Sequence, residues 1–192
     1  MDILSAVDVD LICPFPMTAL NHLCGWMRAH KSFVETDLTG HTPEDYARYF
    51  QELLPYAYTY GVIDRANVLG FKHEMPIIGM VSVQPDGPWN AKLNFACNRR
   101  ALGRYTKNTN NVKIWEAGFM DQAVAAASNQ IFEMCPELLR LSGMTLVTNS
   151  PVRQLYRRLG WGLEGQFDNA AMVGGVPKSV VHYGLLRPAK ET

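Results

Sequence analysis

The chain has 192 residues, about the length of one domain, and 47% of them are hydrophobic, which is enough for a substantial core. Lys plus Arg and Asp plus Glu both total 18, so no overall field attracts nucleic acid or an anionic membrane. The four cysteines form no CxxC pair and the five histidines are dispersed, which excludes the usual zinc motifs.

The first ten residues are acidic and lack the basic start and apolar run of a secretory signal. No apolar stretch approaches the roughly 18 residues that a membrane-spanning helix needs. We therefore expect a soluble cytoplasmic protein with reduced thiols, no metal, and neither nucleic acid nor a membrane as a partner.

Residues 1–41 match no pattern and are left as an unassigned extension, although Thr18 to Ala29 has the spacing of a short helix. A helix is predicted from Thr42, a natural N-cap, because Pro43 suits the first helical position and acidic residues follow it. Pro55 ends this helix.

The next part of the chain has the pattern of antiparallel strands. Strands are predicted at Val68 to Phe71, Ile77 to Val83 and Ala91 to Cys97, the last from its alternation of apolar and polar residues. Pro85 to Pro88 has the composition of a turn. Together these segments predict an antiparallel meander.

A polar stretch, residues 98–111, separates the meander from a long helix predicted over Val112 to Cys135. The final third alternates between strand and helix. Its predicted elements are a strand at Met144 to Thr148, a helix capped by Asn149 or Ser150 and stopped by Gly160, and strands at 163–170 and 179–186 joined through Gly174-Gly175. This order predicts one domain over residues 1–192, α+β or mixed α/β, with a central sheet.

The sequence NSPVRQLYRRLGW at residues 149–161 resembles the pattern N-x-x-A-x-x-L-Y-x-x-x-G-F of the GCN5-related N-acetyltransferase (GNAT) superfamily. Val152 replaces the usual small residue and Trp161 the usual phenylalanine. Residues 175–185 resemble the closing hairpin of the family, with Ser179 at or near the usual aspartate. The resemblance covers residues 144–187 and extends in element order from about residue 42.

The resemblance implies a GNAT-like acyl-CoA N-acyltransferase fold. Such a fold has a central, twisted, mostly antiparallel sheet flanked by helices, and two parallel strands splay apart within it. Here those strands are expected at about 91–97 and 144–148, diverging toward their C-terminal ends. Acyl-CoA lies between the splayed strands, with its pantetheine arm pairing like an added strand.

The resemblance also implies roles at the thioester. Tyr156 corresponds to the tyrosine that protonates the departing CoA thiolate. Asn149 lies close to the thioester, and the backbone near Phe95 to Cys97 hydrogen-bonds its carbonyl. Two other interpretations stay open: Tyr156 is a core tyrosine with a satisfied hydroxyl, and Asn149 is only a helix N-cap.

The family binds pyrophosphate with a loop R/Q-x-x-G-x-G/A before the long helix. Residues 100–105, RALGRY, correspond to it, with Tyr105 in place of the second small residue. Side chains of Arg99, Arg100 and Arg104, together with Gly103, would then hold the phosphates. The alternative is a solvated basic loop.

The implied activity is acetyl-CoA-dependent acetylation of a small-molecule or protein amine by direct attack in a ternary complex. No general base is assigned, because His73 and Glu74 fall in a predicted turn.

The divergent phosphate loop is similar to that of GNAT-like proteins encoded by bacteriophages. That similarity raises an alternative: a GNAT fold without catalysis, kept as an interaction module in the host cytoplasm or a virion. Exposed aromatics, with Tyr58 and Tyr60 among them, would leave a surface for a homo-oligomer or assembly partner.

Overall fold

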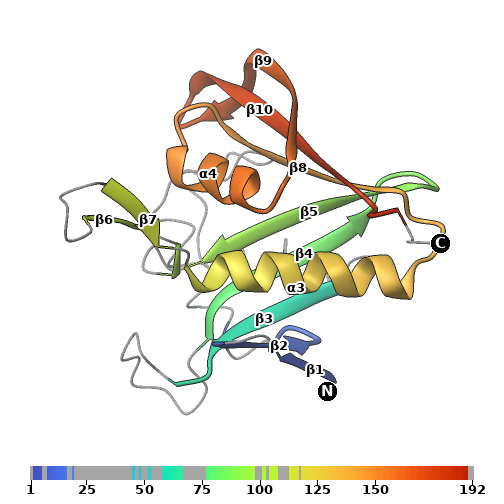
Figure 1. Cartoon of the computed structure of the whole chain (residues 1–192). Helices are drawn as coiled ribbons and strands as arrows, with labels where there is room; N and C mark the ends of the chain where they lie inside the picture. Colours follow the sequence, from blue (N-terminus) through green and yellow to red (C-terminus); the bar gives the residue numbers. More distant parts are fainter. Residues whose placement is uncertain are drawn as a thin grey trace.

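The computed structural model describes residues 2–5, 8–16, 19, 45, 48, 52, 58–66, 77–97, 101–102, 104–107, 113–116 and 118–189. Its centre is an eight-stranded sheet with the strand order β1-β2-β3-β4-β5-β8-β10-β9 (Figure 1). The strands are β1 (Asp2–Ser5), β2 (Val9–Cys13), β3 (Tyr58–Asp64), β4 (Ile77–Pro85), β5 (Asn90–Cys97), β8 (Arg140–Leu146), β9 (Gly162–Val173) and β10 (Val176–Leu186). The β5–β8 pair is parallel, and every other neighbouring pair of this sheet is antiparallel.

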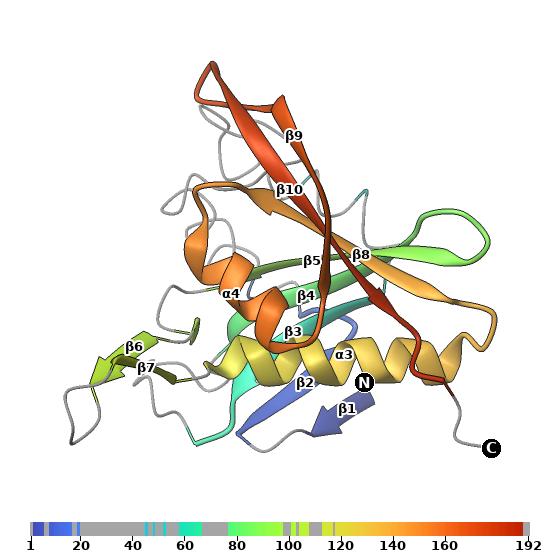
Figure 2. The same cartoon turned by 45° about the horizontal axis from the view of Figure 1, so that its top comes forward.

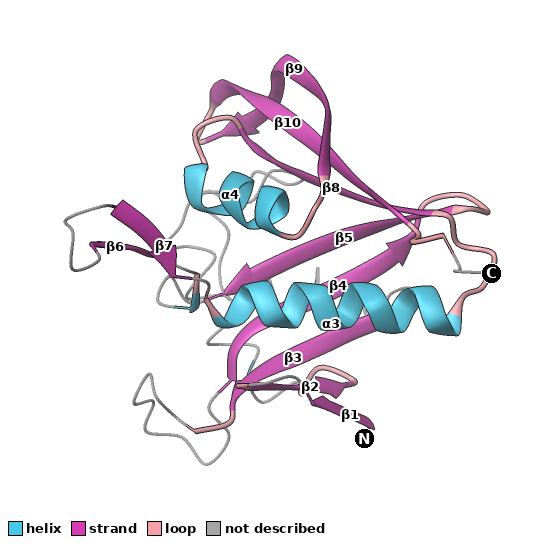
Figure 3. Cartoon of the chain, in the orientation of Figure 1, coloured by secondary structure: helices cyan, strands magenta, loops and turns pink. Residues whose placement is uncertain are grey.

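Two helices pack on one face of this sheet, α3 (Phe119–Met134) and α4 (Ser150–Arg158) (Figure 3). Helix α3 crosses β2, β3 and β4, whereas α4 lies beside β8 and β10. The main core lies between these helices and the sheet and draws on α3, α4 and strands β2, β3, β4, β5, β8 and β10. A β-carbon on Gly79 of β4 would lie 2.8 Å from Met120 Sδ, so α3 approaches the sheet closely there.

A separate two-stranded sheet, β6 (Arg104–Lys107) with β7 (Lys113–Glu116), lies between β5 and α3 in the chain. It projects from the main body near the start of α3 (Figures 1 and 2). The long helix predicted to begin at Val112 therefore begins at Phe119, and this part of the prediction is wrong. Residues 113–116 are extended because they pair with β6, and such pairing cannot be predicted from the local sequence pattern.

The elements predicted for the second half of the sheet are confirmed, although β8 spans Arg140–Leu146 and not Met144 to Thr148. The turn between β4 and β5 lies at residues 86–89, with Gly87 at a φ of 92°. Helix α4 has Asn149 as its N-cap and Pro151 in its first turn, and Gly160, at a φ of 78°, follows its end. Gly174 and Gly175 make the β9–β10 turn with φ values of 60° and 72°. Each positive φ suits glycine, which has no β-carbon to clash.

The first half of the chain was less well predicted. Residues 2–13, left unassigned, supply β1 and β2, and β3 lies at 58–64. Tyr60, expected to be exposed, is 2% exposed within β3, while Tyr58 is exposed. Residues 68–71, 73–74 and 99–100 and most of 18–29 lie outside the described residues. Asp45, Arg48 and Glu52 have helical backbone conformation, as expected for the helix after Thr42.

Candidate functional site

The parallel strands β5 and β8 separate soon after they meet. Their ladder comprises three pairs, Asn90 with Arg140, Ala91 with Leu141 and Lys92 with Ser142. Beyond Lys92, β5 continues to Cys97 paired with β4, and beyond Ser142, β8 continues to Leu146 paired with β10. The two strands diverge toward their C-terminal ends (Figures 1 and 2), which confirms the expected splay.

The splay leaves two strand edges facing each other without a ladder in the middle of a sheet. Each edge carries backbone N–H and C=O groups at residues 93–97 and 143–146, and such groups need hydrogen-bond partners when water is excluded. An extended ligand with amide groups can supply them, in the way that a peptide adds a strand to a sheet edge. We call this place, where the ladder ends at Lys92 and Ser142, the vertex.

Tyr156 of α4 reaches the sheet at the vertex. Its side chain is 1% exposed and lies among three aromatic rings, with centroid distances of 6.0 Å to Phe95, 4.8 Å to Trp161 and 5.0 Å to Tyr183. The ring stacks on Tyr183 at an interplanar angle of 24°. This packing fixes the ring, so the direction of its hydroxyl is also fixed.

Gly143 provides the space for the Tyr156 hydroxyl. A β-carbon on Gly143 would lie 2.6 Å from Tyr156 Cζ and closer still to the hydroxyl oxygen. Gly143 directly follows Ser142, the last residue of β8 that pairs with β5. The hydroxyl therefore lies against the first residue of β8 beyond the vertex. Sequence reasoning missed Gly143, although a glycine inside a strand signals close approach of another group.

Two other polar atoms in this aromatic cluster are buried. Tyr183 Oη and Trp161 Nε1 have no hydrogen-bond partner among the described residues. Tyr156 and Tyr183 thus form a stacked pair in which the two hydroxyls have different surroundings. Tyr156 is a core residue by its burial, and its hydroxyl reaches the splay, while its catalytic role stays a prediction.

The structure places three other predicted site residues around the same splay. Phe95 is half-buried on β5 and meets the Tyr156 ring edge-on. Cys97, at the end of β5, is 7% exposed, and burial raises the pKa of its thiol to about 12. It is a neutral thiol at physiological pH, not a nucleophile. Asn149 is the N-cap of α4, and its side chain makes no capping hydrogen bond.

The residues expected to hold phosphate are separated from α3 by the β6–β7 hairpin. Arg99, Arg100 and Gly103 lie outside the described residues, and Arg104 begins β6. The segment that leads directly into α3 is β7 followed by Gly118. The polar stretch at 98–111, expected to lead directly into the long helix, instead contains β6, and β7 follows it before α3 begins.

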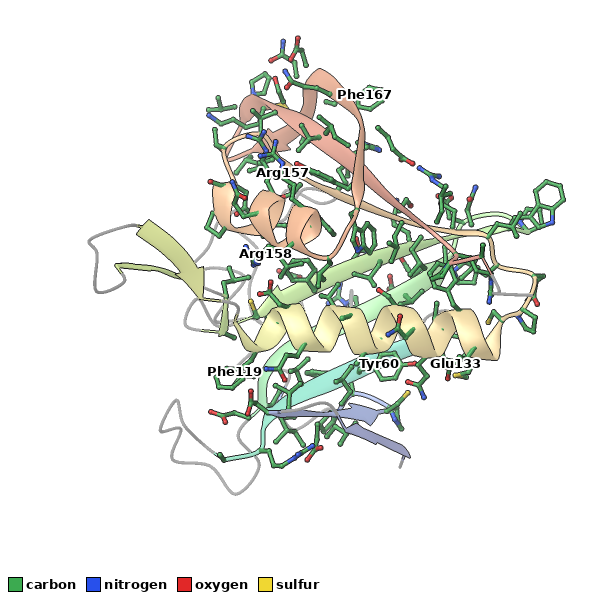
Figure 4. All side chains as sticks on the ribbon, viewed as in Figure 1. Tyr60, Phe119, Glu133, Arg157, Arg158 and Phe167 are labelled. Atoms are coloured by element: carbon green, nitrogen blue, oxygen red, sulfur yellow. The ribbon has the colours of Figure 1, made fainter. Side chains whose placement is uncertain are left out.

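The start of α3 has its own carboxylate. Asp121 accepts a hydrogen bond from the Gly118 N–H at 3.0 Å, which satisfies one free donor of the first turn. The same side chain, 6% exposed, forms an ion pair with Arg158 of α4, with Nη2–Oδ1 at 2.5 Å. Figure 4 shows Arg158 between the two helices. This ion pair links the helix that carries Tyr156 to the start of α3.

The parts of the chain that the structure describes contain no helix long and apolar enough to cross a membrane. Within the same residues, no three His, Cys, Asp or Glu side chains gather so that they could hold a metal ion.

Comparison with solved structures identifies the fold. The chain is similar to RimL, the ribosomal L7/L12 alpha-N-protein acetyltransferase, in complex with coenzyme A, with a TM-score of 0.72, 18% identity and 96% and 98% of the two chains covered. It is also similar to the ribosomal-protein-S5-alanine acetyltransferase from Vibrio fischeri (TM-score 0.69, 14% identity, 97% and 97% covered). A GNAT-family acetyltransferase from Bacillus anthracis matches with a TM-score of 0.64, 14% identity and 96% and 98% coverage. No protein-family model and no curated protein sequence matches the chain.

These likenesses cover nearly the whole chain at low sequence identity. The protein therefore has the GNAT acetyltransferase fold, as the motif at residues 149–161 predicts.

Proposed function

We propose that the protein is an acetyl-CoA-dependent N-acetyltransferase whose acyl site is the splay between β5 and β8. One observation carries the proposal: the Tyr156 hydroxyl lies against Gly143, the first residue of β8 beyond the ladder. A proton donor thus stands beside two unpaired strand edges. The solved structure of RimL with coenzyme A shows that this fold accommodates that molecule.

The proposed reaction is direct transfer. The amine nitrogen of the acceptor attacks the thioester carbonyl carbon, an amide bond forms and the carbon–sulfur bond breaks. Tyr156 donates its proton to the departing thiolate, which makes the sulfur a better leaving group. Backbone N–H groups of residues 95–97 on β5 stabilise the carbonyl oxygen. Asn149, at the start of α4, contacts the thioester end.

The acceptor is a primary amine, and a protein N-terminus is the first candidate to test. RimL is named as an alpha-N-protein acetyltransferase and the Vibrio fischeri protein as a ribosomal-protein-S5-alanine acetyltransferase. Arg99, Arg100 and Arg104, together with Gly103, remain the proposed phosphate contacts. Their charge-assisted hydrogen bonds would each contribute about 1.5–3 kcal/mol.

Acetyl-CoA binding tests the cofactor part of the proposal. At a concentration a hundredfold above Kd it should stabilise the folded protein by about 2.7 kcal/mol, seen as a raised Tm. Replacing both Arg100 and Arg104 with Ala should reduce the shift. Arg65→Ala is the matched control, because Arg65 is exposed and pairs with Asp10 away from the splay. No Tm shift in millimolar acetyl-CoA would favour the non-catalytic module.

Transfer itself is measured as CoA thiol release with a peptide that has a free N-terminal serine or alanine. Release that depends on the peptide and on Tyr156 supports the enzyme. Binding without any transfer to this peptide or to a small polyamine would leave a CoA-binding module and would contradict the proposed activity.

A further inference from the structure

The sheet face opposite α4 carries a group of charged side chains around the vertex. Val181 and Tyr183 of β10 are buried in the main core on the helix side. Because successive strand residues point to opposite faces, His182 of β10 lies on the other face. The same alternation places Lys92 of β5, which lies between the buried Ala91 and Leu93, on that face.

The register of β10 against β8 places His182 at a level just beyond the vertex. On β10, Gly184 pairs with Ser142 at the vertex, and His182 pairs with Met144, two residues farther along β8. Tyr156 meets β8 at Gly143, between those two levels, from the helix side. His182 therefore stands at the level of Tyr156, one strand away from the splay and on the opposite face of the sheet.

The lateral distance is within reach of a side chain and one water molecule. Neighbouring strands lie about 4.8 Å apart, so a ligand that pairs with β8 like an added strand lies roughly 10 Å from the axis of β10. An imidazole side chain, one water and two hydrogen bonds of about 2.6–3.2 Å span such a distance.

Three charged residues surround His182, and each comes from a different strand: Glu164 from β9, Arg140 from β8 and Lys92 from β5. Glu164 is the extra residue of a bulge in β9, between the Leu163–Tyr183 and Gly165–His182 pairs. It lies over Gly184 and forms an ion pair with Arg140 of β8, in which Arg140 Nε donates to Glu164 Oε1 at 2.8 Å. Lys92 of β5 completes the group.

Among these four side chains, the imidazole of His182 is the group that can act as a neutral base. Glu164 is held by Arg140, and Lys92 and Arg140 are cations. The ring of Phe167 packs on the imidazole with centroids 4.7 Å apart, which limits its movement. Burial lowers the pKa of His182; Lys92 and Arg140 lower it further, and Glu164 opposes them. The imidazole is therefore unprotonated at neutral pH and able to accept a proton.

We propose that His182 is the general base of the transfer, on the sheet face opposite the acid Tyr156. This inference rests on the proposed function and adds the residue that sequence reasoning left unassigned. The amine approaches the thioester carbonyl from the His182 face. As the nitrogen–carbon bond forms, the amine proton passes through one water molecule to His182. As the carbon–sulfur bond breaks, the Tyr156 proton passes to sulfur, and both side chains then exchange protons with solvent.

The pairing explains why two groups are needed. The base takes a proton from the amine and the acid gives one to the sulfur, and opposite faces let each group act on its own atom.

The test is His182→Gln in the full-length protein, with Lys178→Gln as the control. Lys178 is exposed on the same strand, beyond a break in its pairing with β9. Glutamine keeps hydrogen-bonding capacity but does not titrate, so kcat/KM for the N-terminal serine peptide should fall roughly 10²–10⁴-fold. The acetyl-CoA Tm shift should hold in both variants. The wild-type and Lys178→Gln profiles should share an acidic limb, displaced below the usual histidine range, that His182→Gln lacks.

A second measurement needs no acceptor. The imidazole NMR signal that disappears in His182→Gln should titrate below the usual histidine range and shift when acetyl-CoA is added. A signal unaffected by acetyl-CoA would overturn the proposal. So would a variant that keeps wild-type kcat/KM and the same acidic limb. Wild-type protein that fails to bind acetyl-CoA would instead remove the proposed function itself, and the role of His182 with it.

Discussion

Tyr156→Phe separates the chemistry of a hydroxyl from the packing of a ring. The ring contacts with Phe95, Trp161 and Tyr183 all remain, because none of them involves the hydroxyl oxygen. The loss in stability is then that of one hydrogen-bonding group, about 0.5–1.5 kcal/mol. In a domain of this size, 1 kcal/mol corresponds to a Tm change of about 2–4 °C. If the hydroxyl protonates the thiolate, kcat should fall roughly 10²–10⁴-fold.

Tyr183→Phe is the matched control. It removes a hydroxyl from the other ring of the stacked pair, and that hydroxyl has no hydrogen-bond partner among the described residues. Removing an unpaired buried donor should raise the free energy of unfolding by up to about 1–3 kcal/mol and leave turnover within about twofold.

The assays are thermal unfolding and steady-state thiol release for each variant at saturating acetyl-CoA. Affinity for acetyl-CoA should be the same in Tyr156→Phe and wild type, because the proton is needed only as the thiolate leaves. Unchanged turnover with a lowered Tm would show that Tyr156 is only structural and would refute the acid role. A large loss of turnover in Tyr183→Phe would show that losing either hydroxyl impairs the site, so the loss in Tyr156→Phe could not be assigned to an acid role.

Two further experiments probe how Tyr156 is held. Gly143→Ala puts a β-carbon 2.6 Å from Tyr156 Cζ, so the ring must move; we expect a loss of about 1–3 kcal/mol in stability and of most transfer activity. Gly162→Ala, where the nearest atom is 3.8 Å away, should change neither, and equal effects of the two would contradict the packing argument. Asp121→Asn breaks the ion pair with the partly exposed Arg158 and should lower the free energy of unfolding by about 1–3 kcal/mol, measured by urea unfolding. Adding Arg158→Gln should cause little further loss, and strictly additive losses would show that the two residues do not interact.

Much of the second half of the fold followed from local signals. The segment from Asn149 to Trp161 specifies a helix by its cap, its proline and its terminal glycine, and those features act within a few residues. The Gly174-Gly175 turn and the alternation in β5 are equally local. The spacing of Asn149 and Tyr156 was also enough to assign the fold and to place Tyr156 at the splay.

Other elements depended on pairing between distant residues. Residues 113–116 have a sequence compatible with the long helix that follows, and their pairing with 104–107 makes them a strand. Similarly, β1 and β2 pair with each other, and β2 pairs with β3 more than forty residues later. The preference of a segment for a strand depends largely on the strands beside it, so it cannot be predicted from the segment's own sequence.

By itself, the sequence determined which residues build the helix side of the candidate site, because Tyr156 is fixed by its position in a helical motif. Only the tertiary structure determined that Gly143 makes room for its hydroxyl and that His182 stands on the opposite face. The vertex brings residues 90–92 beside 140–142, about fifty positions away along the chain, and β10 beside them in turn. Such juxtapositions arise from the register of a whole sheet, which long-range hydrogen bonding and core packing fix together.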